Sequence, residues 1–181
     1  WNEESVTHHG QHFNVSGLGA SIKPKRAGGP PIWVGGDVIA AVQRAAKLNC
    51  PWIAPPTMTF HEIAERVEVY RKASAEISGN SVNEQPIIRE VAIGSTKAEA
   101  LRAARPALLS KYESYASWGQ TATKGQVSLS DTFDEFIKDR FIIGDESEVA
   151  DEVARYKDSF GEGEFLVRIQ WPGFAQSNVL E

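Results

Sequence analysis

The sequence is poor in residues that build covalent or metal-linked structures, with one cysteine and four histidines among 181 residues. A single cysteine, Cys50, excludes an internal disulfide and is typical of a reducing compartment, so we expect a cytoplasmic protein. His8, His9 and His12 share a segment that offers no cysteine or carboxylate partner at the spacing of metal ligands. We therefore expect no metal site.

Runs of like charge and long apolar runs are also missing. The formal net charge is −5, and the one basic cluster, Lys23, Lys25 and Arg26, is interrupted by Pro24. Neither feature is typical of a protein that binds nucleic acid or an anionic membrane. The apolar runs are too short to span a bilayer, and no signal-peptide pattern opens the chain. We expect neither a nucleic acid nor a membrane as partner.

The chain after residues 1–30 repeats one pattern: a short apolar run, then a polar residue that can cap a helix, then an amphipathic helix. The apolar runs are residues 32–34, 52–54, 87–93 and 165–171. Strands that alternate with helices of this length predict parallel pairing and right-handed crossovers. The sequence thus predicts the α/β class with four principal parallel strands, about half of a (β/α)₈ barrel. The periodicity alone also allows an open α/β sheet.

Helix boundaries are marked by capping residues. The expected N-caps are Asp37, Thr59, Thr96 and Asp145. The last three have a glutamate three residues later, which is the capping-box pattern. Pro106 stands inside a predicted helix and should bend its axis. Residues 1–30 are expected to form a loop with one or two short strands, and residues 120–139 an excursion that ends in a short helix, within a single domain of residues 1–181.

Three segments, in the right order, resemble the bacterial-luciferase-like family of flavin-dependent monooxygenases. The segment HHGQHFNV is similar to the hairpin before the fifth strand of their barrel. The segment GPPIWVGGDVIAAVQRAAKLNCPWIAPP is similar to the fifth strand, the helix after it and the next, Trp-containing strand. The segment FIIGDESEVADEVARYKDSFGEGEFLVRIQWPG is similar to the last helix and eighth strand. The resemblance runs from about His8 to Leu180 and implies the second half of a (β/α)₈ barrel.

The resemblance implies FMN or a deazaflavin coenzyme at the carboxyl end of the barrel. The reduced flavin would react with O₂ or exchange a hydride with a small organic substrate. The loop that would hold the flavin phosphate is Gly35, Gly36, Asp37 and Val38. Glycines let backbone approach an anion, and a helix N-terminus offers free amides. The family usually has Ser or Thr in this loop, whereas Asp37 brings a negative charge near a dianion.

The family's first four strands, which carry most of its proposed catalytic groups, have no counterpart here, so no catalytic residue is carried over. We expect the chain alone to be inactive, to carry no stoichiometric flavin, and to form a homo-oligomer or bind a complementing N-terminal half. One alternative is a half-barrel that self-associates as a structural or binding protein without redox turnover. A phosphate-ligand enzyme on an unrelated barrel is a further alternative that the three segments disfavour.

Arg168, Gln170 and Trp171 in the last predicted strand are the candidates for the substrate-facing mouth of the barrel. Alternation along a strand predicts Arg168 and Gln170 on one face and Trp171 on the other. Two structural roles compete with substrate contact. Trp171 could pack against a helix, and Arg168 could pair with Glu90, because an unpartnered charge inside the sheet would be costly. In that case we expect Arg168→Met to cost about 3 kcal/mol or more.

Overall fold

The structure is a computed structural model that describes residues 1–78, 84–119, 129–161 and 163–180. It divides into two compact units, Trp1–Ile32 and Trp33–Glu181, each described by itself. In the first unit, β1 (Val6–His9) pairs antiparallel with β2 (Asn14–Leu18). The amide of Gly10 donates to the carbonyl of Phe13 at 2.9 Å and closes the turn of this hairpin.

The second unit contains only parallel strand pairs among its described residues. Its strands are β3 (Val34–Gly35), β4 (Trp52–Ile53), β5 (Ile87–Ile93), β6 (Ile142–Gly144) and β7 (Phe165–Arg168). β3 pairs with β4, a bridge between Ala54 and Ile87 joins β4 to β5, and β5 pairs with β7. The short β6 lies along the carboxyl-terminal half of β5. The expectation of four principal parallel strands is confirmed by β3, β4, β5 and β7.

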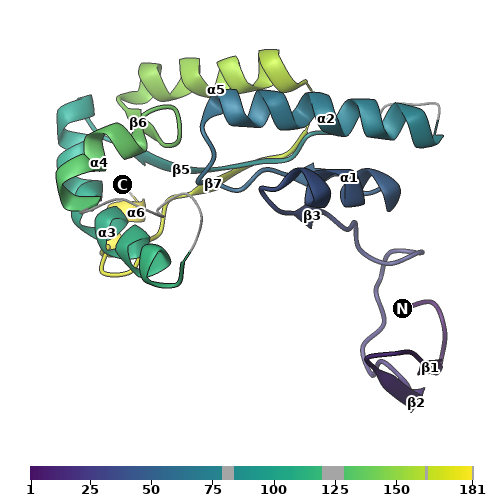
Figure 1. Cartoon of the computed structure of the whole chain (residues 1–181). Helices are drawn as coiled ribbons and strands as arrows, with labels where there is room; N and C mark the ends of the chain where they lie inside the picture. Colours follow the sequence, from purple (N-terminus) through teal and green to yellow (C-terminus); the bar gives the residue numbers. More distant parts are fainter. Residues whose placement is uncertain (79–83, 120–128, 162, 181) are drawn as a thin grey trace. The chain divides into compact units, whose positions relative to one another are not determined.

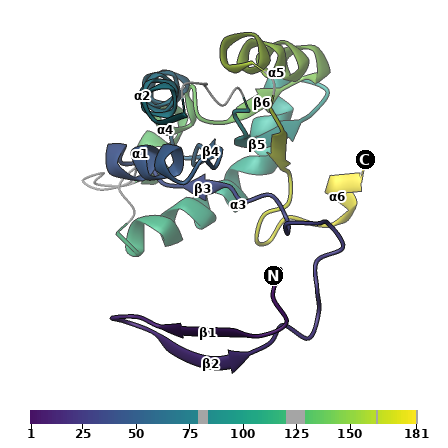
Figure 2. The same cartoon turned by 90° about the vertical axis from the view of Figure 1, so that its right-hand side faces the viewer.

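Helices cover the strands on one side and gather at the carboxyl end of β5. They are α1 (Ile39–Lys47), α2 (Phe60–Ser78), α3 (Lys97–Ser117), α4 (Leu129–Ile137), α5 (Glu146–Phe160) and α6 (Ser177–Leu180). Figure 1 shows α2 and α5 side by side above the strands, with α3 and α4 near the carboxyl end of β5. Figure 2 shows α2 and α5 as neighbours from a second direction. None of the helices in the described ranges is long and apolar enough to cross a membrane.

The two faces of β5 contribute to two separate cores. Ile87 and Val91 lie on the outer face, in a core with buried side chains of α1, α2 and α5. Ala92 lies on the opposite, inner face, in a core with side chains of α3, α4 and the segment after β7. Residues alternate between these faces because successive side chains in a strand point in opposite directions. We call the two clusters the outer core and the inner core.

The helix caps follow the sequence pattern in three of four places. Thr59 and Glu62 exchange the two capping-box hydrogen bonds at the start of α2. Asp145 and Glu148 do the same at α5. At α3 only half of the box forms: Thr96 accepts from the amide of Glu99, whose carboxylate accepts from Ser95 instead of reaching back to the amide of Thr96.

The expected excursion is described from Leu129 onward, where α4 begins. Residues 120–128 lie outside the described ranges, as does the glycine expected to end α2. Gly161 ends α5 with φ +84°, a backbone angle that favours glycine.

Candidate active site at the carboxyl edge of the strands

The parallel strands bring several loops to one edge of the sheet. The loop that begins at Gly35, the segment after β5 and the segment that follows Arg168 all leave the carboxyl ends of their strands. Active sites of (β/α)₈ barrels lie at this edge, because the loops there vary without disturbing the core.

Gly36 is required by the packing of the turn after β3. Its φ is +143°, and a Cβ at this position would lie 2.5 Å from the Cβ of Ala41 in α1. The indole Nε1 of Trp52 donates to the Gly36 carbonyl oxygen at 2.8 Å and fixes the turn from the neighbouring strand. Gly35 is different, because a Cβ there would make only an ordinary 3.7 Å contact with Ile53. Steric need therefore explains Gly36 but not Gly35.

The N-terminus of α1 carries no side-chain cap. The prediction that Asp37 caps this helix is wrong: Val38 is the N-cap, with no side-chain hydrogen bond, and the first turn contains no acidic residue. The turn held by Gly36 and Trp52 sets where the helix begins, so capping preference does not decide it. Val38 and Ile39 are exposed, which leaves the amide end of α1 open to solvent.

Arg66 of α2 reaches this loop, although no local sequence pattern indicates it. Its Nε donates to the carbonyl oxygen of Asp37 at 3.2 Å, and its Nη1 lies 3.6 Å from the Glu65 carboxylate. A guanidinium therefore lies next to the loop that contains Asp37. Only the packing of α2 against α1 brings it there, and that packing is not visible in a helical repeat.

The inner face of β5 holds a fully buried carboxylate, Glu90. Its Oε1 accepts from Lys111 Nζ at 2.5 Å and from the Tyr112 hydroxyl at 2.8 Å, and its Oε2 accepts from Trp171 Nε1 at 2.6 Å. Arg168 Nη1 lies farther away, 3.4 Å from Oε1. Charged and neutral donors thus surround this carboxylate in the inner core.

Burial governs the pKa values in this cluster. Desolvation lowers the pKa of Lys111, although the hydrogen bond to Glu90 favours the ammonium form. Desolvation raises the pKa of Tyr112, and the negative charge of Glu90 raises it further. For Arg168, desolvation opposes the charged form, but the hydroxyl of Tyr115 and the charge of Glu90 outweigh it and raise the pKa.

The three residues expected at the barrel mouth, Arg168, Gln170 and Trp171, differ in their burial and in their partners. Arg168 pairs with Glu90, as its structural alternative anticipated, and its side chain remains 31% exposed. Gln170 is exposed, and its Nε2 donates to the Phe174 carbonyl at 3.0 Å. Trp171 is buried, with its ring centroid 5.1 Å from that of Phe174. The predicted separation of Arg168 and Trp171 onto opposite faces is wrong: β7 ends at Arg168, and both side chains reach Glu90.

Arg89 is a second buried charge, which we had not singled out from the sequence. It lies on the outer face, where its Nε donates to the Tyr156 hydroxyl at 2.8 Å and its Nη1 donates to the carbonyls of Ile88 and Pro55 at 2.9 and 3.3 Å. The guanidinium also lies 5.0 Å from the Tyr156 ring centroid. Desolvation lowers the pKa of Arg89.

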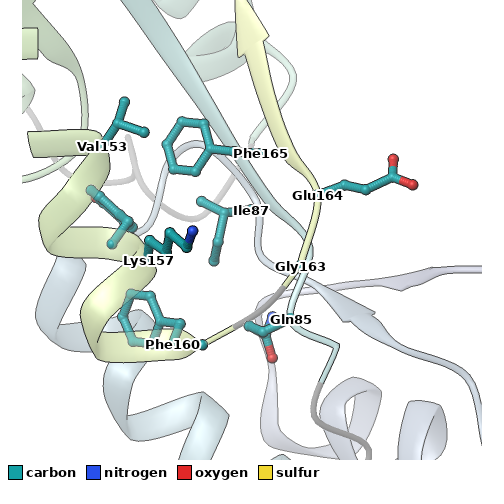
Figure 3. Close-up of a pocket in the computed structure, with 10 residues that line it drawn as sticks. Gln85, Ile87, Val153, Lys157, Phe160, Gly163, Glu164 and Phe165 are labelled. Atoms are coloured by element: carbon teal, nitrogen blue, oxygen red, sulfur yellow. The ribbon is translucent and has the colours of Figure 1, made fainter. Parts of the chain in front are cut away.

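A pocket lies at the other end of β5 and β7, between these strands and α5 (Figure 3). Ile87 and Phe165 line it from the strands, and Val153, Lys157 and Phe160 line it from the helix. The amino ends of barrel strands serve stability more than catalysis. We therefore place the candidate site at the carboxyl edge instead. In the described part of the chain, no group of His, Cys, Asp and Glu side chains is placed to hold a metal ion.

Parallel strands, helices on the outer face and loops gathered at the carboxyl edge define part of a (β/α)₈-type barrel. A sequence model of the family described as luciferase-like monooxygenase matches residues 1–163. The chain therefore belongs to the luciferase-like monooxygenase family.

Solved structures share this fold. Monooxygenase RslO1 from Streptomyces bottropensis is 16% identical with a TM-score of 0.71, over 94% of this chain and 50% of that one. The oxygenating constituent of 3,6-diketocamphane monooxygenase from Pseudomonas putida, in complex with FMN, is 16% identical with a TM-score of 0.66, over 99% of this chain and 56% of that one. An F420-dependent secondary alcohol dehydrogenase, in complex with an F420–acetone adduct, is 13% identical with a TM-score of 0.67, over 98% of this chain and 53% of that one. The chain spans about half the length of these structures.

Proposed function

We propose that the chain is part of a flavin-dependent oxidoreductase that acts on a small organic molecule, with FMN or the deazaflavin F420 as cofactor. The match of the family model to residues 1–163 carries this proposal. Similar structures bind each of the two cofactors, one with FMN and one with an F420 adduct. A bound reduced flavin would supply a hydride or activate O₂.

The loop after β3 fits the phosphate of such a cofactor. Gly35, Gly36, Asp37 and Val38 lead into the uncapped, exposed N-terminus of α1, where free amides and the positive end of the helix dipole favour an anion. The charge of Asp37 opposes a phosphate, but the guanidinium of Arg66 lies at the same loop and offsets it. This arrangement supports the assignment of the loop to the phosphate.

Arg168 and Gln170 are the substrate-side residues in this proposal, because both are accessible at the carboxyl edge. Trp171 has an indirect role: it is buried, and its bond to Glu90 holds the segment after β7 in place. We assign no catalytic group within the chain. Only part of the cofactor site lies in these residues, so we expect the isolated chain to be purified without stoichiometric flavin and to bind added flavin weakly.

Comparison of FMN with riboflavin, which lacks the phosphate, tests the loop directly. Fluorescence titration should show tighter binding of FMN, and Arg66→Met should reduce the difference several-fold by removing the positive charge. Arg71→Met is the matched control, since Arg71 lies on the same helix and contacts Glu68 and the Phe160 carbonyl. Equal affinity for FMN and riboflavin in the unaltered chain would contradict the phosphate loop.

Self-association without redox turnover is the second candidate function, and exposed aliphatic side chains favour it. Ile93 is 61%, Val167 51% and Ile169 39% exposed. Val167 and Ile93 share the outer face of the strands, the face on which Val91 is buried in the outer core. Contact with a second copy or a complementing half-barrel would cover exposed aliphatic groups.

Sedimentation at micromolar concentration, with and without flavin, distinguishes the two candidates. A stable oligomer that shows no preference for FMN over riboflavin would favour the structural role. A monomer that does not bind a hydrophobic dye would remove the support for self-association.

A further inference from the structure

The polar cluster on the inner face contains more positive than negative charge. Lys111 and Arg168 both approach Glu90, which is the one carboxylate within ion-pair distance of either among the described residues. Arg89, on the opposite face of the same strand, is a third cation; it is fully buried, and its described partners are all uncharged. Interior charges are costly unless they are paired, so this excess of cations favours an anion at the accessible side of the cluster.

Glu90 does not need Arg168 as a partner. Its two oxygens already accept three short hydrogen bonds, from Lys111, Tyr112 and Trp171, between 2.5 and 2.8 Å. Arg168 is at 3.4 Å, a distance that brings charge attraction but little hydrogen bonding. The guanidinium is therefore oriented by Glu90 while most of its five N–H donors remain available.

The hydroxyl of Tyr115 supplies a second donor beside Arg168. Arg168 Nη2 donates to this hydroxyl oxygen at 3.4 Å, and no acceptor for the hydroxyl proton is found among the described residues. The Tyr115 ring is held between Tyr112 and Trp118, with centroid distances of 5.4 and 5.5 Å. The ring contacts hold the hydroxyl beside the guanidinium.

The surface next to Arg168 is partly apolar. Leu166, two residues earlier in β7, and Ile88, which pairs with Leu166 in the sheet, share the inner face with Arg168 and are half-buried. A charged head group at Arg168 would thus have an aliphatic surface beside it. This combination suits an organic anion better than a bare inorganic ion.

We propose that Arg168 and the Tyr115 hydroxyl bind the carboxylate of an organic substrate at the carboxyl ends of β5 and β7. The site rests on the proposed function for its role, since it would give a flavin-dependent oxidoreductase an anchor for an acidic substrate. It is separate from the phosphate loop: β3 and β7 lie three strand spacings apart in the sheet order, about 14 Å. The guanidinium would take the carboxylate through two parallel N–H donors, and Tyr115 would add a third hydrogen bond.

Titration of the full chain with benzoate, followed through arginine Nε–Hε signals in ¹⁵N-resolved NMR spectra, tests this site without flavin. Benzamide, neutral and of the same shape, is the matched ligand, and both titrations are run at constant ionic strength. We expect benzoate to shift one arginine signal, absent in Arg168→Met, in a saturable way, and benzamide to leave it unchanged. The affinity for benzoate should fall at least about tenfold in Arg168→Met and several-fold in Tyr115→Phe.

Arg105→Met is the control variant. Arg105 is 35% exposed, close to the 31% of Arg168, but it pairs with a carboxylate, Asp134, that has no second cation among the described residues. This variant should bind benzoate as the unaltered chain does. Tyr115→Phe removes only a hydroxyl, so it keeps the test decisive if Arg168→Met does not fold.

Equal binding of benzoate and benzamide, or undiminished binding in both Arg168→Met and Tyr115→Phe, would overturn the carboxylate site. Its failure is distinguishable from failure of the proposed function, because the preference for FMN over riboflavin is measured separately and depends on Arg66. Benzoate binding at Arg168 without any FMN preference would leave this site standing and contradict the phosphate loop.

Discussion

Arg89 and Glu90 are neighbours in sequence, both fully buried and opposite in charge, yet the two faces of β5 accommodate them differently. On the inner face Glu90 accepts hydrogen bonds from Lys111, Tyr112 and Trp171, and Arg168 lies within ion-pair distance of it. On the outer face Arg89 donates to a tyrosine hydroxyl and two backbone carbonyls, with no carboxylate within ion-pair distance among the described residues. The charge of Glu90 is therefore neutralised by ion pairs, whereas the charge of Arg89 is stabilised only by uncharged hydrogen-bonding groups.

This difference indicates that paired charges are part of the packing on the inner face of β5 but not on its outer face. Loss of Glu90 would leave a buried cation and several buried donors unpaired, whereas loss of Arg89 would remove a charge that has no counter-ion. The inner face should therefore be more sensitive to substitution and to pH than the outer face.

The largest effect is expected from Glu90→Leu. It leaves Lys111 as a buried ammonium without its carboxylate and deprives Tyr112 and Trp171 of their acceptor, so the free energy of unfolding should fall by about 3–5 kcal/mol. Urea unfolding measures the loss. Glu152→Leu is the control, because Glu152 pairs with Arg155 near the surface, where such pairs contribute about 1 kcal/mol or less. Equal losses in the two variants would show that Glu90 is not a central acceptor.

The second largest difference between the two faces is expected at high pH, in the stability that Tyr112 and Tyr156 contribute. Burial raises the pKa of both Tyr112 and Tyr156, but the charge of Glu90 raises that of Tyr112 further, whereas Arg89 opposes the rise at Tyr156. The unfolded chain releases these phenolic protons first, so this stability is present below about pH 10 and lost as pH rises beyond it, at up to about 1.4 kcal/mol per pH unit for each tyrosine.

The variants Tyr112→Phe and Tyr156→Phe test whether Tyr112 makes the larger pH-dependent contribution to stability. Lys111, whose pKa is lowered, contributes the opposite slope only up to about pH 10.5, so the comparison is made above that value. Tyr112→Phe should flatten the decline of unfolding free energy more than Tyr156→Phe does. A larger flattening in Tyr156→Phe than in Tyr112→Phe would contradict the proposed electrostatic difference between the two faces.

Arg89→Met should have a smaller effect than Glu90→Leu. Methionine can fill part of the space beneath Tyr156 without a charge, so we expect a change of about 1–2 kcal/mol, measured by the same urea unfolding. Arg89→Ala separates packing from charge, because it adds a cavity to the loss of the guanidinium. If Arg89→Met lowered the free energy of unfolding as much as Glu90→Leu does, the proposed difference between the ion-paired Glu90 and the Arg89 with uncharged partners would be wrong.

The smallest effect is expected from Arg168→Met, at about 1 kcal/mol. The sequence alone had led us to expect about 3 kcal/mol or more, on the assumption that Arg168 was the partner on which Glu90 depends. Because Lys111 remains in place at 2.5 Å, Glu90 stays paired without Arg168. A double-mutant cycle with Glu90→Gln in thermal or urea unfolding should give a coupling below that of the same cycle with Lys111→Met. A larger coupling for Arg168 would restore the original expectation.

The sequence predicted the four principal strands and the helices α1 to α5 for simple reasons, and it offered the Glu90–Arg168 pair as one of two roles for Arg168. Apolar runs and polar caps are local signals, so the four principal strands and the cap at Asp145 could be located directly. The pair of Glu90 with Arg168 followed from two opposite charges in strands expected to be buried. These features need no knowledge of how helices cross the sheet.

The remaining parts of the site depend on packing that no local pattern contains. Lys111 next to an apolar stripe resembles a solvated surface lysine, yet the position of α3 on the inner face buries it against Glu90. Asp37 has a better capping side chain than Val38, but the turn at Gly36 decides where α1 begins. Arg66 reaches the loop only because α2 lies against α1.

The alignment of β5 with β7 has a consequence for folding. Glu90 stands directly opposite Arg168, with Arg89 opposite Val167 on the other face. A slip of one residue would place Val167 or Ile169 against the buried carboxylate and would turn Arg168 toward the side that already holds Arg89. Two like charges would then meet under α5 while an aliphatic group faced Glu90. The charge pattern of the two strands therefore favours the observed alignment, because a slip of one residue would separate Glu90 from Arg168 and bring two cations to the same face.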